Sequence, residues 1–161
     1  MKNLKYLVFL FFASFLIMSC GDDDPTRADY VETLSAGDWT MTSQTLNGVE
    51  RDFGGTLTSH VQTHLSCDLD AGECSGSNSY VLELDNNGGT VTGGSTFTWT
   101  INEDVTTITF NVITQTTNGV TTNCTADCQT VATILEWTEN RHVLEITDDN
   151  GDVYVRTMER I

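Results

Sequence analysis

Positive charge and proline are both scarce in this chain. Its 161 residues include 7 Lys and Arg against 23 Asp and Glu, a formal net charge of −16, and 1 Pro. Proteins that bind nucleic acid neutralise phosphates with Lys and Arg, so this balance argues against a nucleic-acid partner. The hydrophobic fraction of 39% can support a core, and the length fits one domain. The 27 Thr favour β-structure.

Sequence patterns of catalytic sites are also missing. No glycine-rich phosphate loop follows a predicted strand, and we expect Gly88-Gly89 and Gly93-Gly94 to lie in turns. The segment from Gly72 to Gly76 reads Gly-Glu-Cys-Ser-Gly and lacks the central Ser of a hydrolase nucleophile turn. His60 and His64 lie in the segment with the weakest pattern and His142 at a strand start, so a His-based catalytic group is only the alternative interpretation. The sequence therefore predicts a protein that is not an enzyme and has no cofactor.

The chain has one long hydrophobic run, at its N-terminus. Lys2 and Lys5 precede an apolar segment of about a dozen residues between Leu7 and Met18. A membrane-spanning helix needs about 20 apolar residues. The run is therefore typical of a signal peptide, which we assign to residues 1–19.

The end of that run, Ile17-Met18-Ser19-Cys20, resembles the lipobox of bacterial lipoproteins. The resemblance implies cleavage before Cys20 and lipidation of its sulfur, with palmitate-type acyl chains as a membrane anchor. Such chains bind a bilayer firmly, because each buried CH₂ contributes about 0.8 kcal/mol. The alternative is an ordinary secretory signal with a coincidental Cys at this position.

Three carboxylates follow the lipidation site directly, in Gly21-Asp22-Asp23-Asp24. This segment resembles the acidic surface-export signal of Bacteroidota lipoproteins, which implies an outer-membrane location exposed at the cell surface. The alternative is a solvated acidic spacer. In either case we assign residues 20–32 to a lipid anchor and acidic linker.

The charge becomes more one-sided once residues 1–19 are set aside. Residues 20–161 contain 5 Arg, no Lys and 23 Asp and Glu, so their net charge is −18. This charge keeps a domain soluble and away from anionic surfaces. It also disfavours acidic ligands, unless a buried Arg is reserved for them.

Four cysteines remain besides Cys20, and an even number in an exported domain indicates two disulfides. We expect the local pairs Cys67–Cys74 and Cys124–Cys128, each closing a polar loop at a hairpin tip. The alternative is that the two loops meet and the bridges cross between them. Short loops gain little stability from a cross-link in the chain-entropy model, so these bridges would mainly hold loop shape.

A zinc site is the competing interpretation of part of this set. His60, His64, Cys67 and Cys74 offer two imidazoles and two thiolates. On a strand, however, His60 and His64 face one side and Cys67 faces the other. Because the surrounding sequence is Thr-rich and favours strand, we expect no metal site.

Most of the chain beyond residue 36 alternates between apolar and polar residues, as antiparallel strands do. The clearest examples are Phe97 to Ile101 and Ile108 to Val112, and Asn47-Gly48 is a strong hairpin signal. We expect Trp39, Met41 and Ser43 to share one face, opposite Gln44, and expect Val131, Thr133, Leu135 and Trp137 to share another. Residues 29–36 fit either a helical turn or an extended lead-in.

The number and spacing of these segments predict an all-β fold. An antiparallel up-and-down meander of about eight to ten strands avoids exposed edges by closing on itself. We therefore expect residues 33–161 to form a barrel or a barrel-like sandwich.

The strand pattern also resembles a known family. Gly37-Asp38-Trp39 resembles the Gly-x-Trp signature of lipocalins. The order of the Asp85–Gly88 turn, the Trp99 strand, the Leu135–Leu144 hairpin and a final strand with Tyr154 and Arg156 is similar to lipocalin-like domains of Bacteroidota lipoproteins. The resemblance implies a small up-and-down barrel with an anchored N-terminus, but no defined function.

Large aromatic residues are the one indication of a binding site. We expect five of them to point inward and, if the barrel is open at one end, to line a pocket for a small hydrophobic ligand. These candidates are Trp39, Phe97, Trp99, Phe110 and Trp137. The predicted protein is then a monomeric, surface-anchored binding module. The alternative is a structural or adhesive lipoprotein whose aromatic residues fill a closed core.

Overall fold

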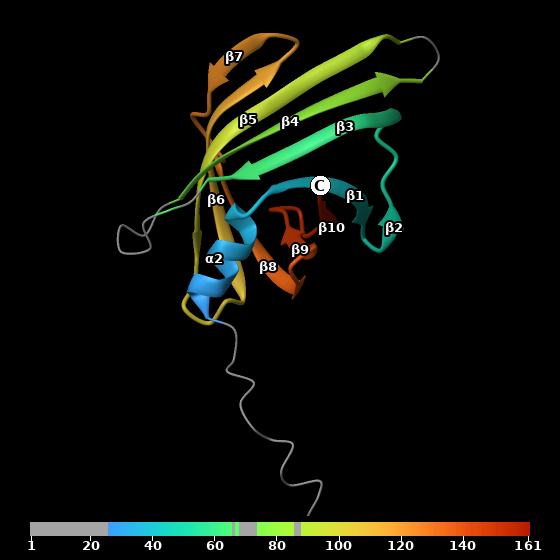
Figure 1. Cartoon of the computed structure of the whole chain (residues 1–161). Helices are drawn as coiled ribbons and strands as arrows, with labels where there is room; N and C mark the ends of the chain where they lie inside the picture. Colours follow the sequence, from blue (N-terminus) through green and yellow to red (C-terminus); the bar gives the residue numbers. More distant parts are fainter. Residues whose placement is uncertain (1–25, 66, 68–73, 86–87) are drawn as a thin grey trace, which may run out of the picture.

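The computed structural model describes residues 26–65, 67, 74–85 and 88–161, which form one helix and ten strands (Figure 1). The elements are α2 (Arg27–Ser35), β1 (Asp38–Leu46), β2 (Val49–Glu50), β3 (Gly55–His64), β4 (Cys74–Leu84), β5 (Thr90–Ile101), β6 (Thr107–Thr117), β7 (Val120–Asn123), β8 (Gln129–Trp137), β9 (Arg141–Thr147) and β10 (Val153–Arg160). The predictions for the signal peptide, for Cys20 and for the acidic segment concern residues outside this description. Within the described residues, no helix is both long and apolar enough to cross a membrane.

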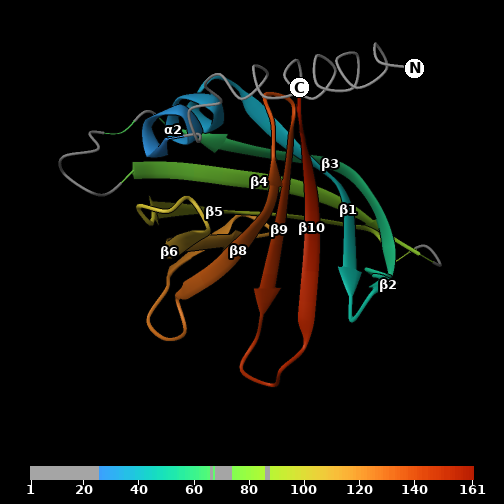
Figure 2. The same ribbon diagram turned by 90° about the horizontal axis from the view of Figure 1, so that it is seen from below.

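Eight of the strands form a closed antiparallel barrel. Their order is β1-β3-β4-β5-β6-β8-β9-β10, and β10 pairs back with β1 from Trp39↔Arg160 to Leu46↔Tyr154. The short strands β2 and β7 extend β1 and β6 as hairpins. Figures 1 and 2 show the strands curving around a common interior. The predicted all-β meander is confirmed, and the closure between first and last strands makes it a barrel.

The predicted hairpin turn at Asn47-Gly48 has the backbone that its sequence requires, and a second Asn-Gly pair has the same conformation. Asn47 and Gly48 have φ of 52° and 80°, and Asn118 and Gly119 have φ of 49° and 81°. Positive φ at both central residues is the condition for a type I′ turn, and Asn-Gly tolerates it best. These turns start β2 and β7, the strands outside the barrel wall.

A β-bulge at Thr42 changes which side chains of β1 face inward. The register with β10 runs from Met41↔Met158 directly to Ser43↔Thr157, so Thr42 is an extra residue. Trp39 is buried before the bulge and Gln44 is buried after it. The predicted face with Ser43 inward and Gln44 outward is therefore wrong, because strict alternation does not allow for an inserted residue.

A second β-bulge, in β8, makes the predicted inward face of that strand wrong as well. Ala132 is buried there, whereas Val131 and Leu135 are 53% and 51% exposed. The register runs from Ile134↔Leu144 to Glu136↔Val143, so Leu135 is the bulged residue. Because the bulge reverses the alternation, Trp137 packs against the core, although Val131 and Leu135, which also have odd residue numbers, are exposed.

Gly93 and Gly94 do not form a turn, contrary to the sequence prediction. They lie within β5, which runs without a break from Thr90 to Ile101. A Cβ atom on Gly93 would overlap the ring of Tyr80 on β4, and one on Gly94 would overlap the carbonyl oxygen of Asn78. These two strand positions therefore require glycine, because atoms of β4 occupy the space that a side chain would need.

Helix α2 resolves the choice that the sequence left open for residues 29–36. It starts with a capping box, in which Asp29 N–H donates to Thr26 Oγ1 (3.3 Å) and Thr26 N–H donates to Asp29 Oδ2 (2.8 Å). These hydrogen bonds also lower the pKa of Asp29. Tyr30 and Val31 on this helix belong to the core, so the packed unit extends upstream of the boundary expected at residue 33.

The buried core that the described residues form runs from Tyr30 to Met158. Its largest fully buried side chains are Trp39, Trp99, Tyr30, Leu34 and Ile108. The segment from residue 26 onward thus holds both its own core and its own closed sheet, the two requirements for an independently folding unit.

Both predicted local disulfide pairs are present. Cys67 and Cys74 have a Cα–Cα distance of 4.5 Å, and Cys124 and Cys128 one of 5.8 Å. Cys74 opens β4 and is buried in the core, whereas the second bridge lies in the connection between β7 and β8. The crossed pairing is therefore excluded for this fold.

Candidate functional site

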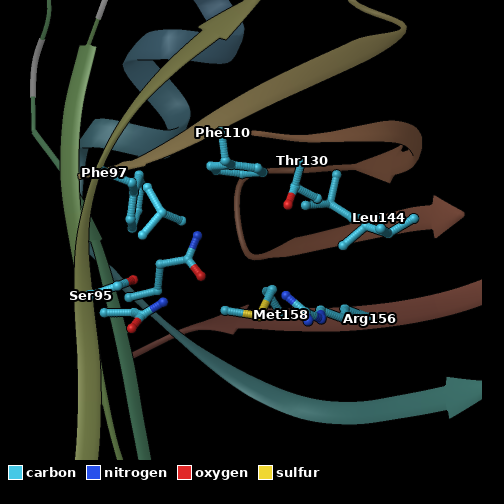
Figure 3. Close-up of a pocket in the computed structure, with 11 residues that line it drawn as sticks. Ser95, Phe97, Phe110, Thr130, Leu144, Arg156 and Met158 are labelled. Atoms are coloured by element: carbon cyan, nitrogen blue, oxygen red, sulfur yellow. The ribbon is translucent and has the colours of Figure 1, made fainter. Parts of the chain in front are cut away.

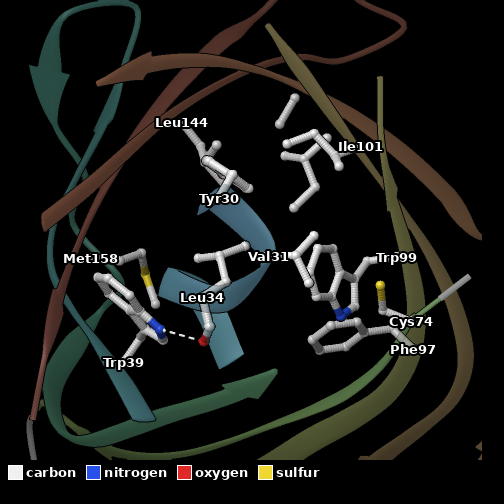
Figure 4. Close-up of a cluster of buried hydrophobic side chains, with 12 residues drawn as sticks. Tyr30, Val31, Leu34, Trp39, Cys74, Phe97, Trp99, Ile101, Leu144 and Met158 are labelled. Atoms are coloured by element: carbon white, nitrogen blue, oxygen red, sulfur yellow. Dashed lines mark hydrogen bonds between the residues drawn. The ribbon is translucent and has the colours of Figure 1, made fainter. Parts of the chain in front are cut away.

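One end of the barrel is filled by helix α2. The side chains of Tyr30, Val31 and Leu34 are buried, and Trp39 Nε1 donates a hydrogen bond to the Leu34 carbonyl (3.0 Å). Figure 4 shows α2 inside the ring of strands, with Trp39 and Met158 on one side and Trp99 and Phe97 on the other. This end of the interior is a packed core.

A buried polar pair completes the filled end. The Tyr30 hydroxyl and His142 Nε2 form a hydrogen bond, and the Tyr30 ring meets Trp137 edge-on at a centroid distance of 5.1 Å. Burial raises the pKa of Tyr30. Burial, and secondarily the charge of His64, lowers the pKa of His142 to about 3. Both groups are therefore neutral at pH 7, as two polar groups sharing one buried hydrogen bond should be.

The other part of the interior contains two adjoining cavities of about 100 and about 320 Å³. They share Gln62, Asn78, Arg156 and Met158 as lining residues. Figure 3 shows the smaller cavity, with Phe97 and Ser95 on one side facing Leu144, Met158 and Arg156 on the other. The barrel is therefore filled at one end and hollow beyond it, and the hollow part is the candidate site.

The five aromatic residues expected to line a pocket divide between these two regions. All are buried or partly buried against the core, so their inward direction is as predicted. Phe97 and Phe110 line the smaller cavity. Trp39, Trp99 and Trp137 line neither cavity and pack in the filled end. The sequence did not separate the two groups because it did not show that α2 occupies the barrel at the level of the three Trp.

The smaller cavity is mainly apolar. Besides Phe97 and Phe110 it is lined by Val112, Leu144, Ile146 and Met158, with Ser95 and Thr130 as small polar groups. Phe97 and Phe110 meet edge-on at a centroid distance of 5.5 Å. This wall offers the contact surface that an apolar group of a ligand needs.

The larger cavity adds cationic and amide groups. Arg156 from β10 donates from Nε to Gln44 Oε1 (3.1 Å), so the bulged strand β1 supplies its partner. Arg51, beyond β2, lines the same cavity and lies over the rings of Phe53 and Tyr154. Desolvation by the surrounding barrel residues and the charge of Arg51 lower the pKa of Arg156, but a guanidinium stays protonated at physiological pH.

His60 is a further polar group of the larger cavity. Its Nδ1 accepts a hydrogen bond from the Met41 N–H (3.1 Å), so in the neutral ring the proton is on Nε2. Burial and the charge of Arg156 both lower the pKa of His60. The imidazole is therefore neutral at pH 7 and retains one N–H donor.

Negative charge is absent from both cavities. No Asp or Glu is among their lining residues in the described part of the chain. The ion pairs among the described residues are Arg141–Glu136 and Arg160–Glu139, and neither involves Arg51 or Arg156. Within the larger cavity, the two arginines thus lie among amides, an imidazole and aromatic rings, whereas the hollow on the other side of Arg51 includes Glu50.

The residues considered for zinc serve other purposes. His60 and His64 both point inward from β3, as expected for a strand, but His64 packs edge-on against Trp99 at a centroid distance of 5.3 Å. Burial lowers the pKa of His64 to about 4. Cys67 and Cys74 are bonded to each other. Among the described residues, no three side chains of metal-ligating type gather.

The polar half of the site was not identified from the sequence. Gln44, Gln62, Asn78 and Arg156 do not stand out as a motif, because they come from four strands. One signal was present for Arg156, which is two residues before the buried Met158 and therefore shares its inward face. Gln44 gave no such signal, since the bulge at Thr42 reverses its side.

No protein-family model matches the chain, and no curated protein sequence matches it.

Proposed function

We propose that this protein is a non-catalytic binding module that holds a small hydrophobic ligand inside its barrel. The observation that supports this proposal is the hollow half of the interior, which has an apolar wall around Phe97 and Phe110 next to a few polar groups. Binding sites for small molecules combine a concave apolar surface with a few polar groups that orient the ligand.

The size of the cavities limits the ligand. Small-molecule sites commonly have about 300–1,000 Å³, and the larger cavity, at about 320 Å³, is at the lower end of that range. A closed structural barrel would have continued the packing of α2 through the whole interior, because native cores contain few voids larger than a water molecule. The hollow half is therefore better explained by a ligand than by a purely structural or adhesive role.

The proposal places the barrel on a lipid anchor at the outer membrane, exposed at the cell surface. Its support is the lipobox resemblance at Cys20, the acidic segment after it and the strand pattern similar to lipocalin-like lipoproteins of Bacteroidota. In this arrangement residues 20–25 connect the membrane to α2, and the barrel acts as a tethered monomer.

Native mass spectrometry of the chain from Gly21 onward, exported so that both disulfides form, tests the proposal. We expect a species heavier than the polypeptide by the mass of a small molecule, which is released on denaturation. A polypeptide mass alone after gentle purification would contradict the proposal and favour the closed structural role.

A matched pair of variants connects the bound mass to the cavity. Ser95→Phe fills the smaller cavity from β5 and should abolish the mass increment. Thr96→Phe alters the next residue, which is exposed and faces outward, and should retain it. Loss in both variants would indicate damage to β5 rather than occupation of the cavity.

A further inference from the structure

We propose that the cavity selects ligands that carry an anionic head group on an apolar body, with the head group bound between Arg156 and Arg51. This inference rests on the proposed binding function and specifies the chemical class of the ligand. Its starting point is the distribution of charge, which differs between the cavity and the rest of the molecule.

The cavity concentrates the rare positive charge of the chain. Residues 20–161 contain five Arg and no Lys, and two of the five, Arg51 and Arg156, line the larger cavity. The 23 Asp and Glu contribute no lining residue to either cavity in the described part of the chain. A neutral ligand would need neither guanidinium, and a cationic ligand would be repelled by both.

An unpaired hydrogen-bond donor in the larger cavity also favours an anionic head group. Gln44 is 4% exposed and lines the larger cavity, and its Nε2 has no hydrogen-bond partner. Its Oε1 is already used by Arg156 Nε. A buried amide donor without an acceptor is destabilising, and a carboxylate or similar oxyanion beside Arg156 would supply acceptor oxygens to both groups at once.

The apolar body of the ligand has a place beside this head-group site. Arg156 and Met158 line both cavities, so a head group at Arg156 adjoins the smaller cavity with its wall of Phe97, Phe110 and Leu144. An alkyl chain or ring entering that space would leave water while the head group stays in the larger cavity. The two adjoining cavities thus match the two parts of one amphipathic acid.

The net charge of −18 opposes the approach of an anion but does not prevent binding inside. At physiological ionic strength, interactions between exposed charges are screened beyond about 8 Å. Within the barrel the groups nearest to a ligand are Arg156 and the other lining residues, and these include no carboxylate. The local charge therefore decides which head group is retained.

Calorimetric titration of the chain from Gly21 with three probes of equal chain length tests the inference. The probes are decanoate and decyltrimethylammonium, each below its micellar concentration, and decanol below its solubility limit. We expect decanoate to bind at least roughly tenfold more tightly than decanol, as hydrogen bonds to charged groups allow, and the cation not to bind. Equal affinity for decanoate and decanol would overturn the head-group assignment but leave the binding function intact. Failure of all three probes would count against both.

Variants then locate the head group. Arg156→Met and Arg51→Gln should each weaken decanoate binding by roughly ten- to hundredfold while changing decanol affinity little. Arg141→Gln removes the same charge from an exposed ion pair outside the cavities and should leave both affinities unchanged. Equal weakening by all three variants would show a general charge effect and overturn the site.

A stability measurement separates binding from structure. Arg156 is exposed on β10 and has no carboxylate partner among the described residues, so Arg156→Met removes only its hydrogen bond to Gln44 Oε1 and should lower the Tm of the ligand-free protein by a few degrees at most, about the effect of one hydrogen bond. A large fall in Tm together with unchanged relative affinities would show that Arg156 serves the fold and not a ligand.

Discussion

Two buried histidines make the core sensitive to acid. His64 packs against Trp99 and Phe97 with its Nδ1 unpaired, and His142 is hydrogen-bonded to Tyr30. Their pKa values are lowered to about 4 and about 3. In the unfolded chain a His titrates near pH 6.5. Between these values the unfolded state binds more protons, so the contribution of each His to stability is complete above about pH 6.5 and is lost as the pH falls.

Replacement of His64 tests this account at the residue scale. His64→Phe fits an aromatic environment and removes one titrating group, so the unfolding free energy should fall less steeply with acidification than in the wild type. Between pH 7 and pH 4.5 we expect the wild type to lose about 2 kcal/mol more than the variant. Denaturant unfolding over this range measures it, and the comparison cancels the contribution of the many surface carboxylates. Parallel pH profiles would show that His64 is not the source.

At the scale of elements, α2 determines where the barrel is solid. Its capping box starts the helix at Arg27, and its buried side chains occupy the interior that the strands alone would leave empty. Arg160 at the end of β10 donates to the Thr33 carbonyl and lies over the Trp39 ring, which ties the helix to the closure between β1 and β10. Helix α2 thus fills one end of the barrel. Because it ends at Ser35, the rest of the interior stays hollow.

Replacement of a buried α2 side chain by a smaller one should therefore lower the free energy of unfolding substantially. Leu34 is 1% exposed, and Leu34→Ala should lower the unfolding free energy by about 2–5 kcal/mol, as in other cores where a leucine is replaced by a smaller residue. Glu32→Ala changes an exposed position of the same helix and should stay within about 0.5 kcal/mol of the wild type. Chemical denaturation of both variants gives the comparison, and a similar small effect in both would mean that α2 is not part of the cooperative unit.

Irregularities of the strands have functional consequences at the same scale. The bulge at Thr42 directs Gln44 inward beside Arg156, and Gly93 leaves space for the Tyr80 ring that lines the larger cavity. Without these two features, the larger cavity would lose an amide and be reshaped at one wall. Bulges near sites commonly re-aim side chains in this way.

For the whole molecule, the barrel and the proposed anchor are separate parts. The core and the closed sheet of the described residues lie beyond residue 25, whereas the segment that resembles a lipobox ends at Cys20. Changes to the anchor should therefore alter location without altering the fold.

Cys20→Ala tests the anchor directly. Because lipidation requires the Cys sulfur, the variant should move from the membrane fraction to the soluble fraction after cell disruption. The double variant Cys124→Ala with Cys128→Ala removes two other cysteines and should remain with the membrane. Immunoblotting of the fractions gives the result, and unchanged membrane retention of Cys20→Ala would contradict lipidation.

The sequence predicted much of the fold through local signals. The Asn47-Gly48 hairpin, the alternation in Phe97–Ile101 and the short spacing within each Cys pair depend on neighbouring residues, and the structure agrees with them. The prediction for Gly93 was wrong because glycine suits both turns and close contacts, and only the neighbouring strand distinguishes the two.

The candidate site was predicted only in part. Phe97 and Phe110 line a cavity, as expected for large apolar residues on inward positions, but the three Trp expected beside them pack around α2. The cationic and amide groups were not predicted, since they come from separate strands and one of them follows a bulge.

The sequence alone determined the all-β class, the meander of strands and the strongly negative charge, and it favoured the local disulfide pairs, because each depends on composition or on residues close together in the chain. Tertiary structure decided which half of the barrel is filled, which aromatic residues reach the cavity, and that two of the few arginines meet there without a carboxylate. These properties depend on how distant strands align when the barrel closes around α2. A single inserted residue in a strand changes that alignment without altering the pattern on either side of it.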